Sequence, residues 1–231
     1  MRSSCVGNPV EQLNDEIARC RACPRLVAWR EQVARERRRA FADETYWGRA
    51  VPSFGTDNGP ILIVGLAPAA HGANRTGRMF TGDRSADVLM TAMHRAGLAS
   101  QPDSTHRNDG LTLLGCRVTA AVHCAPPGNR PAPDERARCQ RFLEREVTLV
   151  DPRVILALGA IAWDGVLGTL AALGHPQRPK PRFGHGAEVR IGQRWLVGAY
   201  HPSQQNTFTG RLTPAMLDAV LVRAVARARA A

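Results

Sequence analysis

The sequence predicts an α/β domain built on a mainly parallel sheet. Three apolar runs of strand length, at 61–66, 111–122 and 154–158, are separated by segments with helical periodicity. Strands that alternate with helices form parallel sheets in which the helices make the crossovers. The 231 residues are enough for one domain with a sizeable core, and no internal repeat or domain boundary divides 1–231.

The first half of the chain contains two helical segments, a loop and a strand. Helix is expected from about residue 10 to 39, with an interruption at Cys23-Pro24 because proline does not continue a helix. Residues 41–60 lack a period and are rich in turn residues, which indicates a loop. The run 61–66 is apolar at every position, as in strands that are buried on both faces, and 85–97 is expected to be a helix that stops at Gly97.

The second half predicts further strands and helices. They are a strand at 111–122, a charged helix at 133–150, a strand at 154–158, a helix from 160 to about 173, a weaker strand pair near 188–190 and 195–200, and a last helix from Thr213. Ligands bind at the carboxyl ends of parallel strands. The site is therefore expected in the loops GLAPAAHG, HCAPPGN, LGAIAW and AYHPSQQN.

Composition indicates a globular protein. Hydrophobic residues make up 44% and charged residues 22% of the chain, and no run of eighteen apolar residues predicts a membrane span. The N-terminal twenty residues have no apolar core and carry acids early, so they do not read as a secretory signal. We expect a cytoplasmic protein, located at the nucleoid if its partner is DNA.

The charge balance favours a polyanionic partner. The formal net charge is +11, and nucleic acid is the first candidate for such an excess. Thirty arginines stand against one lysine, Lys180, which also reflects genomic composition. Arginine suits planar, bidentate contacts with phosphate.

Six cysteines favour a metal or cluster site over disulfides in a cytoplasmic chain. Cys20 and Cys23 lie on one turn, and with Cys124 and Cys139 they supply four thiolates, enough for tetrahedral zinc or a 4Fe–4S cluster. The spacing alone does not separate these two. Cys5 and Cys116 have no close partner in the sequence, and Cys116, in an apolar run, is expected to be a plain buried thiol.

The loop GLAPAAHGANRTGRMFTGD, from Gly65 to Asp83, follows the first strand but lacks the features of a phosphate-binding loop. Gly65 and Gly72 let the backbone approach a ligand closely. Phe80 offers a flat ring near the Asp83 carboxylate, which suits a planar base, although core packing explains Phe80 equally well.

The segment HPSQQNTFTGR begins with His201 at the end of a predicted strand. Small and amide side chains follow, and then Arg211. This pattern indicates a donor that meets developing charge next to a nucleic-acid contact loop.

Together these motifs resemble family 5 (B-type) uracil-DNA glycosylases. The resemblance runs from about residue 20 to 214 and includes YWGRAVPSFG, HCAPPGNRPAP, HPSQQNTFTGRLTP and the four cysteines. It implies a three-layer αβα fold around a mostly parallel four-stranded sheet. It also implies hydrolysis of the N-glycosidic bond of uracil, hypoxanthine and other deaminated bases in DNA, which initiates base excision repair, and a 4Fe–4S cluster on Cys20, Cys23, Cys124 and Cys139.

The resemblance also implies catalytic roles. Phe80 would stack on an extruded base, and backbone amides at Gly65 and Leu66 with His201 would donate to its oxygen. Related glycosylases carry a carboxylate where this chain has Ala67, so Asp83 is expected to orient water or stabilise the cationic sugar. The other polar side chains expected to hold water or sugar are His71 and Asn74.

Substrate and DNA contacts are implied in the same way. Ala120 stands where some relatives have an asparagine that reads uracil, so a broader range of bases is expected. The expected wedge into the DNA stack is Gln204, Gln205 and Asn206, and the expected phosphate contacts are Arg75, Arg78 and Arg211. The partner would be DNA with deaminated bases, and the protein a monomer without a membrane partner. Alternatives are a noncatalytic DNA-binding module with a cluster or zinc, and an enzyme for free nucleosides or nucleotides.

Overall fold

The computed structural model describes residues 8–230, and Cys5 lies outside this range. A six-stranded sheet forms the centre, with strand order β1-β3-β2-β4-β6-β5. Its four inner strands run parallel and are β3 (Cys116–Ala120), β2 (Ile61–Gly65), β4 (Val154–Leu158) and β6 (Arg194–Ala199). The predicted four-stranded parallel sheet is thus confirmed, and β1 (Phe54–Gly55) and β5 (Glu188–Ile191) extend it antiparallel at the two edges.

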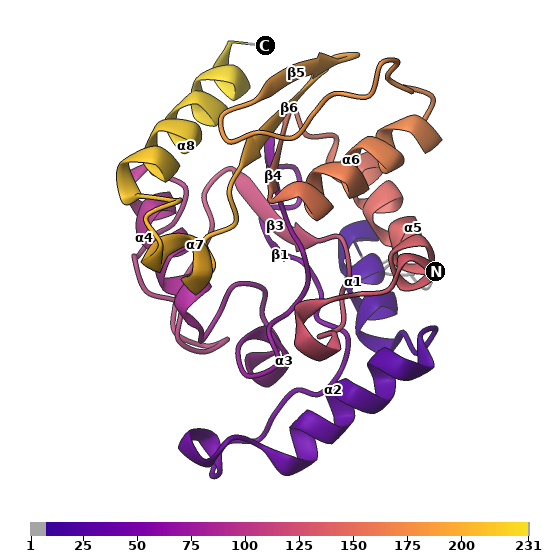
Figure 1. Cartoon of the computed structure of the whole chain (residues 1–231), viewed down its shortest axis with the longest axis vertical. Coiled ribbons are helices and arrows are strands. Elements are labelled where there is room, and N and C mark those ends of the chain that lie inside the picture. Colours follow the sequence, from indigo (N-terminus) through magenta and orange to yellow (C-terminus); the bar gives the residue numbers. More distant parts are fainter. Residues whose placement is uncertain (1–7, 231) are drawn as a thin grey trace, which may run out of the picture.

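Helices cover both faces of the sheet, as Figure 1 shows. One face carries α4 (Arg84–Arg95) and α8 (Pro214–Arg229), and the other carries α5 (Pro133–Val150) and α6 (Ala160–Ala172). The remaining helices are α1 (Pro9–Arg19), α2 (Pro24–Glu36), the short α3 (Ala73–Thr76) and α7 (Gln204–Phe208), and the 3-10 turns η1 (Arg39–Phe41) and η2 (Pro127–Asn129). The predicted α/β architecture with three layers is confirmed. Within residues 8–230, no helix is long and apolar enough to cross a membrane.

The all-apolar strands β2 and β4 are buried on both faces because successive side chains point to opposite sides. Ile61 and Ile63 join the core under α4 and α8, while Leu62 and Val64 join the core under α5 and α6. A strand of this kind cannot move without exposing apolar surface in two cores. The carboxyl ends of these strands therefore give the loops beyond them a rigid base.

One predicted boundary agrees with the structure and another differs. The predicted break at Cys23-Pro24 is confirmed, since α1 ends at Arg19 and α2 starts at Pro24. The strand predicted over 111–122 is shorter, because only Cys116–Ala120 joins the sheet and Leu113 instead pairs with Ala99 in an isolated bridge.

Arg78 and Arg75 brace the loop between β2 and α4 from inside. Arg78 is 6% exposed; its guanidinium pairs with Asp109 (2.7 Å) and also donates to the hydroxyls of Thr81 and Ser104 and the carbonyl of Arg107. Arg75 is buried over the Phe41 ring, with Glu44 and the carbonyls of His71 and Gly82 as partners. This geometry does not favour the expectation that these two arginines contact phosphates, because their donors are engaged within the fold, although Arg75 also lines the large cavity described below.

Asp109→Asn is expected to lower the free energy of unfolding by about 3 kcal/mol, because it leaves the buried Arg78 charge without a counter-ion. Burial alone would raise the pKa of Asp109, but hydrogen bonds from Arg78 and from the backbone of Leu111 and Thr105 outweigh it and hold the pKa well below its usual range. The contribution is therefore complete at neutral pH and is lost only in strong acid. Urea unfolding at pH 7 measures it. Asp103→Asn, on the same loop but exposed, is the control, and equal stability of both variants would contradict the prediction.

Candidate functional site

A small pocket lies at the carboxyl ends of the central parallel strands. It combines three segments that the sequence analysis singled out: the 65–85 loop, the end of β3 and the loop after β6. The lining residues are Ala67, Pro68, Ala69, Ala73, Met79, Phe80, Asp83, Ser85, Ala120 and His201. Most of them are small or apolar, so the pocket suits a flat ring with few polar atoms.

Phe80 forms one wall of this pocket in a strained backbone conformation. Its φ is 47°, in the left-handed region that a bulky side chain rarely adopts. The ring packs directly on Gly65, the last residue of β2, where an added Cβ would lie 2.9 Å from Phe80 Cζ. Leu66 follows, and its carbonyl accepts from Val122 N (3.0 Å), which fixes the start of the loop to the β3 segment. Only glycine at position 65 permits this placement of the ring.

His201 faces Phe80 with its ring centroid 6.0 Å away. Burial lowers the pKa of His201 to about 4, so the imidazole is neutral at pH 7 and keeps one ring N–H as a donor. Asn206 holds this residue in place, since its Nδ2 donates to His201 O at 2.8 Å. Asn206, expected in the wedge, thus supports the histidine instead.

Asp83 is both the N-cap of α4 and a lining residue. Its Oδ1 accepts from Ser85 N (2.9 Å) and Ala86 N (3.0 Å). Its Oδ2 lies against Gly72, where an added Cβ would come within 2.0 Å of it. Burial raises the pKa of the carboxyl, against the two backbone hydrogen bonds that lower it. Among residues 8–230, no hydrogen-bond donor occupies Oδ2, so it is free to meet a ligand.

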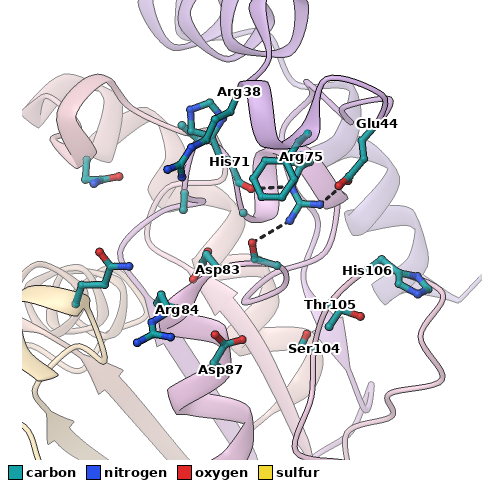
Figure 2. Close-up of a pocket in the computed structure, with 17 residues that line it drawn as sticks. Arg38, Glu44, His71, Arg75, Asp83, Arg84, Asp87, Ser104, Thr105 and His106 are labelled. Atoms are coloured by element: carbon teal, nitrogen blue, oxygen red, sulfur yellow. Dashed lines mark hydrogen bonds and ion pairs between the residues drawn. The ribbon is translucent and has the colours of Figure 1, made fainter. Parts of the chain in front are cut away.

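A second cavity of about 970 Å³ adjoins the small pocket, and Figure 2 shows its walls. Charged side chains of both signs line it: the arginines Arg38, Arg75 and Arg84 and the acids Glu44, Asp83 and Asp87, together with His71 and His106. Asp83 and Ala69 line both spaces. A ligand with a flat ring in the small pocket and a polar part in the large cavity would therefore pass Asp83.

His71 projects into the larger cavity with its Nδ1 in a hydrogen bond. Its Nδ1 lies 3.0 Å from the hydroxyl of Tyr46, which also accepts from Arg38 N (3.3 Å). Tyr46 is 7% exposed and has a single hydroxyl proton, for which His71 Nδ1 is the acceptor in the described part of the chain. We therefore predict that the imidazole carries its proton on Nε2, which leaves Nδ1 to accept the hydroxyl proton of Tyr46. Burial, with Arg38 and Arg75 nearby, lowers the pKa of His71, which keeps the ring neutral.

Asn74 does not reach either space. It is fully buried, and its Nδ2 donates to the carbonyls of Arg30 (3.3 Å) and Ala70 (3.4 Å). The expectation that Asn74 holds water or sugar is not supported by this geometry. Its place indicates that it holds the loop.

Helix α7 borders the large cavity with the residues expected to enter the DNA stack. Gln204 lines the cavity, and Gln205 is exposed. Phe208, on the same helix, is 70% exposed, and the Arg84 guanidinium lies 5.7 Å from the centre of its ring. The sequence alone did not point to this exposed ring, because the residues around it are polar. Arg211 is exposed with its guanidinium over the Tyr200 ring, where its donors remain accessible to a phosphate.

The four cysteines line one pocket between α1, α2, the end of β3 and α5. Donors approach three of the sulfurs: Arg30 Nη1 is 2.8 Å from Cys124 Sγ, His123 N is 3.4 Å from Cys139 Sγ, and Arg141 Nη2 is 3.9 Å from Cys20 Sγ. Donors of this kind fit deprotonated, metal-bound sulfur. Burial raises the pKa of Cys124 to about 11 and that of Cys139 to about 12. A metal ion that binds here would therefore have to displace the protons of these thiols.

The thiols surround a pocket and do not converge on one point. Across residues 8–230, no group of three or more His, Cys, Asp or Glu side chains is placed to hold a single metal ion. Cys116 lies apart, buried in β3 with its thiol directed at Leu98 O, as expected for a plain buried thiol.

Known proteins resemble the chain over most of its length. The model of the uracil DNA glycosylase superfamily matches residues 52–224. Proteins named type-5 uracil-DNA glycosylase are 58% identical over 210 residues in Mycobacterium tuberculosis (strain CDC 1551 / Oshkosh; 90% of this chain, 77% of the relative) and 58% identical over 213 residues in Mycobacterium leprae (strain TN; 90% and 91%). One from Thermus thermophilus is 50% identical over 212 residues (90% and 93%).

Tyr46→Phe is expected to release the tautomer of His71, because the ring loses the hydroxyl proton directed at its Nδ1. Nitrogen-15 NMR of the histidine ring should show Nε2–H in the unsubstituted protein and a mixture of both tautomers in the variant. Tyr200→Phe is the matched control and should leave His71 unchanged. A protonated Nδ1 in the unsubstituted protein would contradict the assignment.

Proposed function

The chain belongs to the uracil-DNA glycosylase superfamily, and from this membership we propose that it removes uracil from DNA by hydrolysing the bond between base and deoxyribose. The observation that supports the mechanism most directly is the position of Asp83. It lies where a pocket for a flat ring opens into a large cavity lined by charged side chains of both signs. The glycosidic bond joins those two parts of a nucleotide.

The base must leave the helical stack before its bond to the sugar can be reached, which costs a few kcal/mol, about the strength of lost stacking and pairing. The small pocket offers the base a new surface in Phe80 and apolar walls of alanine, proline and methionine. The fixed ring of Phe80 on Gly65 means that this surface exists before the base arrives.

His201 stabilises the departing base. Negative charge collects on the base oxygens as the bond breaks, and a donor already in position lowers the barrier by about 3 kcal/mol, as oxyanion donors do. With its pKa lowered to about 4, His201 is neutral and acts as a hydrogen-bond donor without adding a buried charge. Asn206 keeps it oriented.

Asp83 meets the positive charge that develops on the sugar. Its Oδ1 is engaged at the start of α4, and its Oδ2 is free beside Gly72. Ala67 lines the same pocket with a small side chain and leaves space there. Asp83 would orient the water or stabilise the cationic sugar, and His71 would donate from Nε2 to the sugar–phosphate part in the larger cavity.

Two features concern the range of substrates. Ala120 lines the base pocket with a methyl group and not an amide, so little in the pocket would reject other bases by hydrogen bonding. We therefore extend the proposal to hypoxanthine. Arg38, Arg84 and Arg211 would meet DNA phosphates, with Gln204 and Phe208 of α7 closest to the bases.

The cysteine pocket would hold a 4Fe–4S cluster on Cys20, Cys23, Cys124 and Cys139. The four thiols surround a pocket, and N–H donors are directed at their sulfurs. This arrangement fits a cluster, in which each iron takes one thiolate, better than it fits a single zinc ion. When bound, it would supply a covalent link between the turn before α2 and the segment from β3 to α5. Base release by hydrolysis needs no electron transfer.

The proposal is tested on duplex DNA with a single uracil or a single hypoxanthine, followed by alkaline cleavage at the abasic site. The protein should release both bases, and His201→Ala should reduce release by about 100-fold, since it removes one transition-state donor. Strand cleavage at uracil but not at hypoxanthine would restrict the proposal to uracil. No cleavage at either base would overturn it in favour of a DNA-binding module.

Variants of Asp83 separate its two roles. Asp83→Asn and Asp83→Ser both retain a cap for α4, so they should fold with near-native stability but lose about 100-fold in uracil release. Asp83→Ala should in addition lose about 1 kcal/mol of stability. Because burial raises the pKa of Asp83, uracil release should fall in acid at a pH above that typical of aspartate, and Asp83→Asn should lack this decline. Full uracil release by Asp83→Asn would show that the carboxylate is not needed.

A further inference from the structure

Arg30 is a buried charge without a carboxylate partner. Four arginines are buried in the part of the chain that the structure describes, and the other three pair with acids: Arg75 with Glu44, Arg78 with Asp109, and Arg117 with Glu146. Arg30, on α2, is 1% exposed and has no such ion pair among residues 8–230. A buried guanidinium needs a compensating anion.

The groups around the Arg30 guanidinium belong to the cysteine pocket. Nη1 donates to Cys124 Sγ at 2.8 Å and Nη2 to Cys20 O at 2.9 Å, while Nε is buried and has no partner among the described residues. A protonated thiol offers no charge to offset the guanidinium. A deprotonated sulfur bound to iron does, because the four thiolates leave the cluster with a net negative charge.

The backbone of Arg30 faces the catalytic loop. Its carbonyl accepts from Asn74 Nδ2 at 3.3 Å, and Asn74 O in turn accepts from Gly48 N at 3.1 Å. Gly48 packs so closely on α2 that an added Cβ would lie 2.8 Å from Ala34 Cβ. Figure 1 shows α2 beside α3, the short helix within that loop. One residue thus contacts both the cysteine pocket and the loop that ends at Asp83.

We propose that Arg30 is the counter-ion of the cluster and the positioning residue that couples the cluster to the loop from 69 to 76. This inference rests on the cluster in the proposed function. Arg30 touches neither base nor sugar. Its role is to place α2 against Asn74, so that the loop carrying His71 holds its shape only when the sulfurs next to Arg30 are charged and fixed.

The test compares Arg30→Gln, which removes the charge, and Arg30→Lys, which keeps it, with Arg35→Gln on the exposed side of the same helix. Iron and sulfide content are measured first, followed by the rate at which a chelator removes the cluster absorbance. Hydrogen exchange of the peptide 69–76 is then followed in each loaded variant and in the unsubstituted protein stripped of its cluster. None of these readouts depends on base release.

Arg30→Gln should retain the cluster about 10- to 100-fold less well, in the range found for residues that support metal ligands. Its 69–76 peptide should exchange faster, as should that of the stripped protein. Arg30→Lys should fall between, and Arg35→Gln should match the unsubstituted protein.

The outcomes separate this inference from the function. Absence of iron and sulfide in the unsubstituted protein would overturn both the cluster and the role of Arg30, whatever the glycosylase activity. A cluster held equally by Arg30→Gln and Arg35→Gln, with equal exchange, would overturn the role of Arg30 alone. If Arg30→Gln does not fold, Arg30→Lys decides: faster cluster loss than in Arg35→Gln supports the proposal, and equal loss overturns it.

Discussion

The contact of the Phe80 ring with the Cα of Gly65 is the constraint on which the site depends. Strand β2 is buried on both faces, so its last residue is fixed in space by two cores. The ring stacked on that residue sets where the loop returns, at the cost of a left-handed backbone at Phe80. Three residues later the chain reaches Asp83 and starts α4. The base surface and the carboxylate are thus set by the position of one strand end.

Internal arginines hold the rest of this loop. The arginines of a basic chain are expected to face DNA. Arg75 and Arg78 instead direct their donors to groups within the fold, on the loop and on the segments packed against it. Arg30 directs its own to the sulfur of Cys124 and the carbonyl of Cys20. The burial of these charges is stable only with partners in place. The loop therefore has a defined shape before any ligand binds, which spares the entropy of ordering it on binding.

The sequence was sufficient for the layers, the parallel strands, the break at Cys23-Pro24 and the segments that meet at the site, because these follow from apolar periodicity, proline and recognisable motifs. It was not sufficient to tell buried from exposed arginines, since both look alike in a basic stretch and differ only in whether a partner such as Asp109, 31 residues away, folds onto them. Tyr46 and Arg30 were missed for the same reason: their partners His71, Cys124 and Asn74 are distant in the chain. Nothing in the sequence indicated that Asn206, expected in the wedge, donates a hydrogen bond to the carbonyl of His201.

The place of Asp83 at the start of α4 determines the chemistry of its carboxylate. An aspartate at a helix N-cap receives two backbone hydrogen bonds and the favourable end of the helix dipole, both of which stabilise its charged form against the burial that opposes it. Burial outweighs these two effects and leaves the pKa of the carboxyl raised, but the carboxylate is a fixed negative charge with one oxygen free. A reaction through a cationic sugar requires a fixed negative charge of this kind. The bond to the base breaks before water attacks, so the water need not be a strong nucleophile. The N-cap geometry therefore favours stabilisation of the sugar cation over activation of water as the main contribution of Asp83.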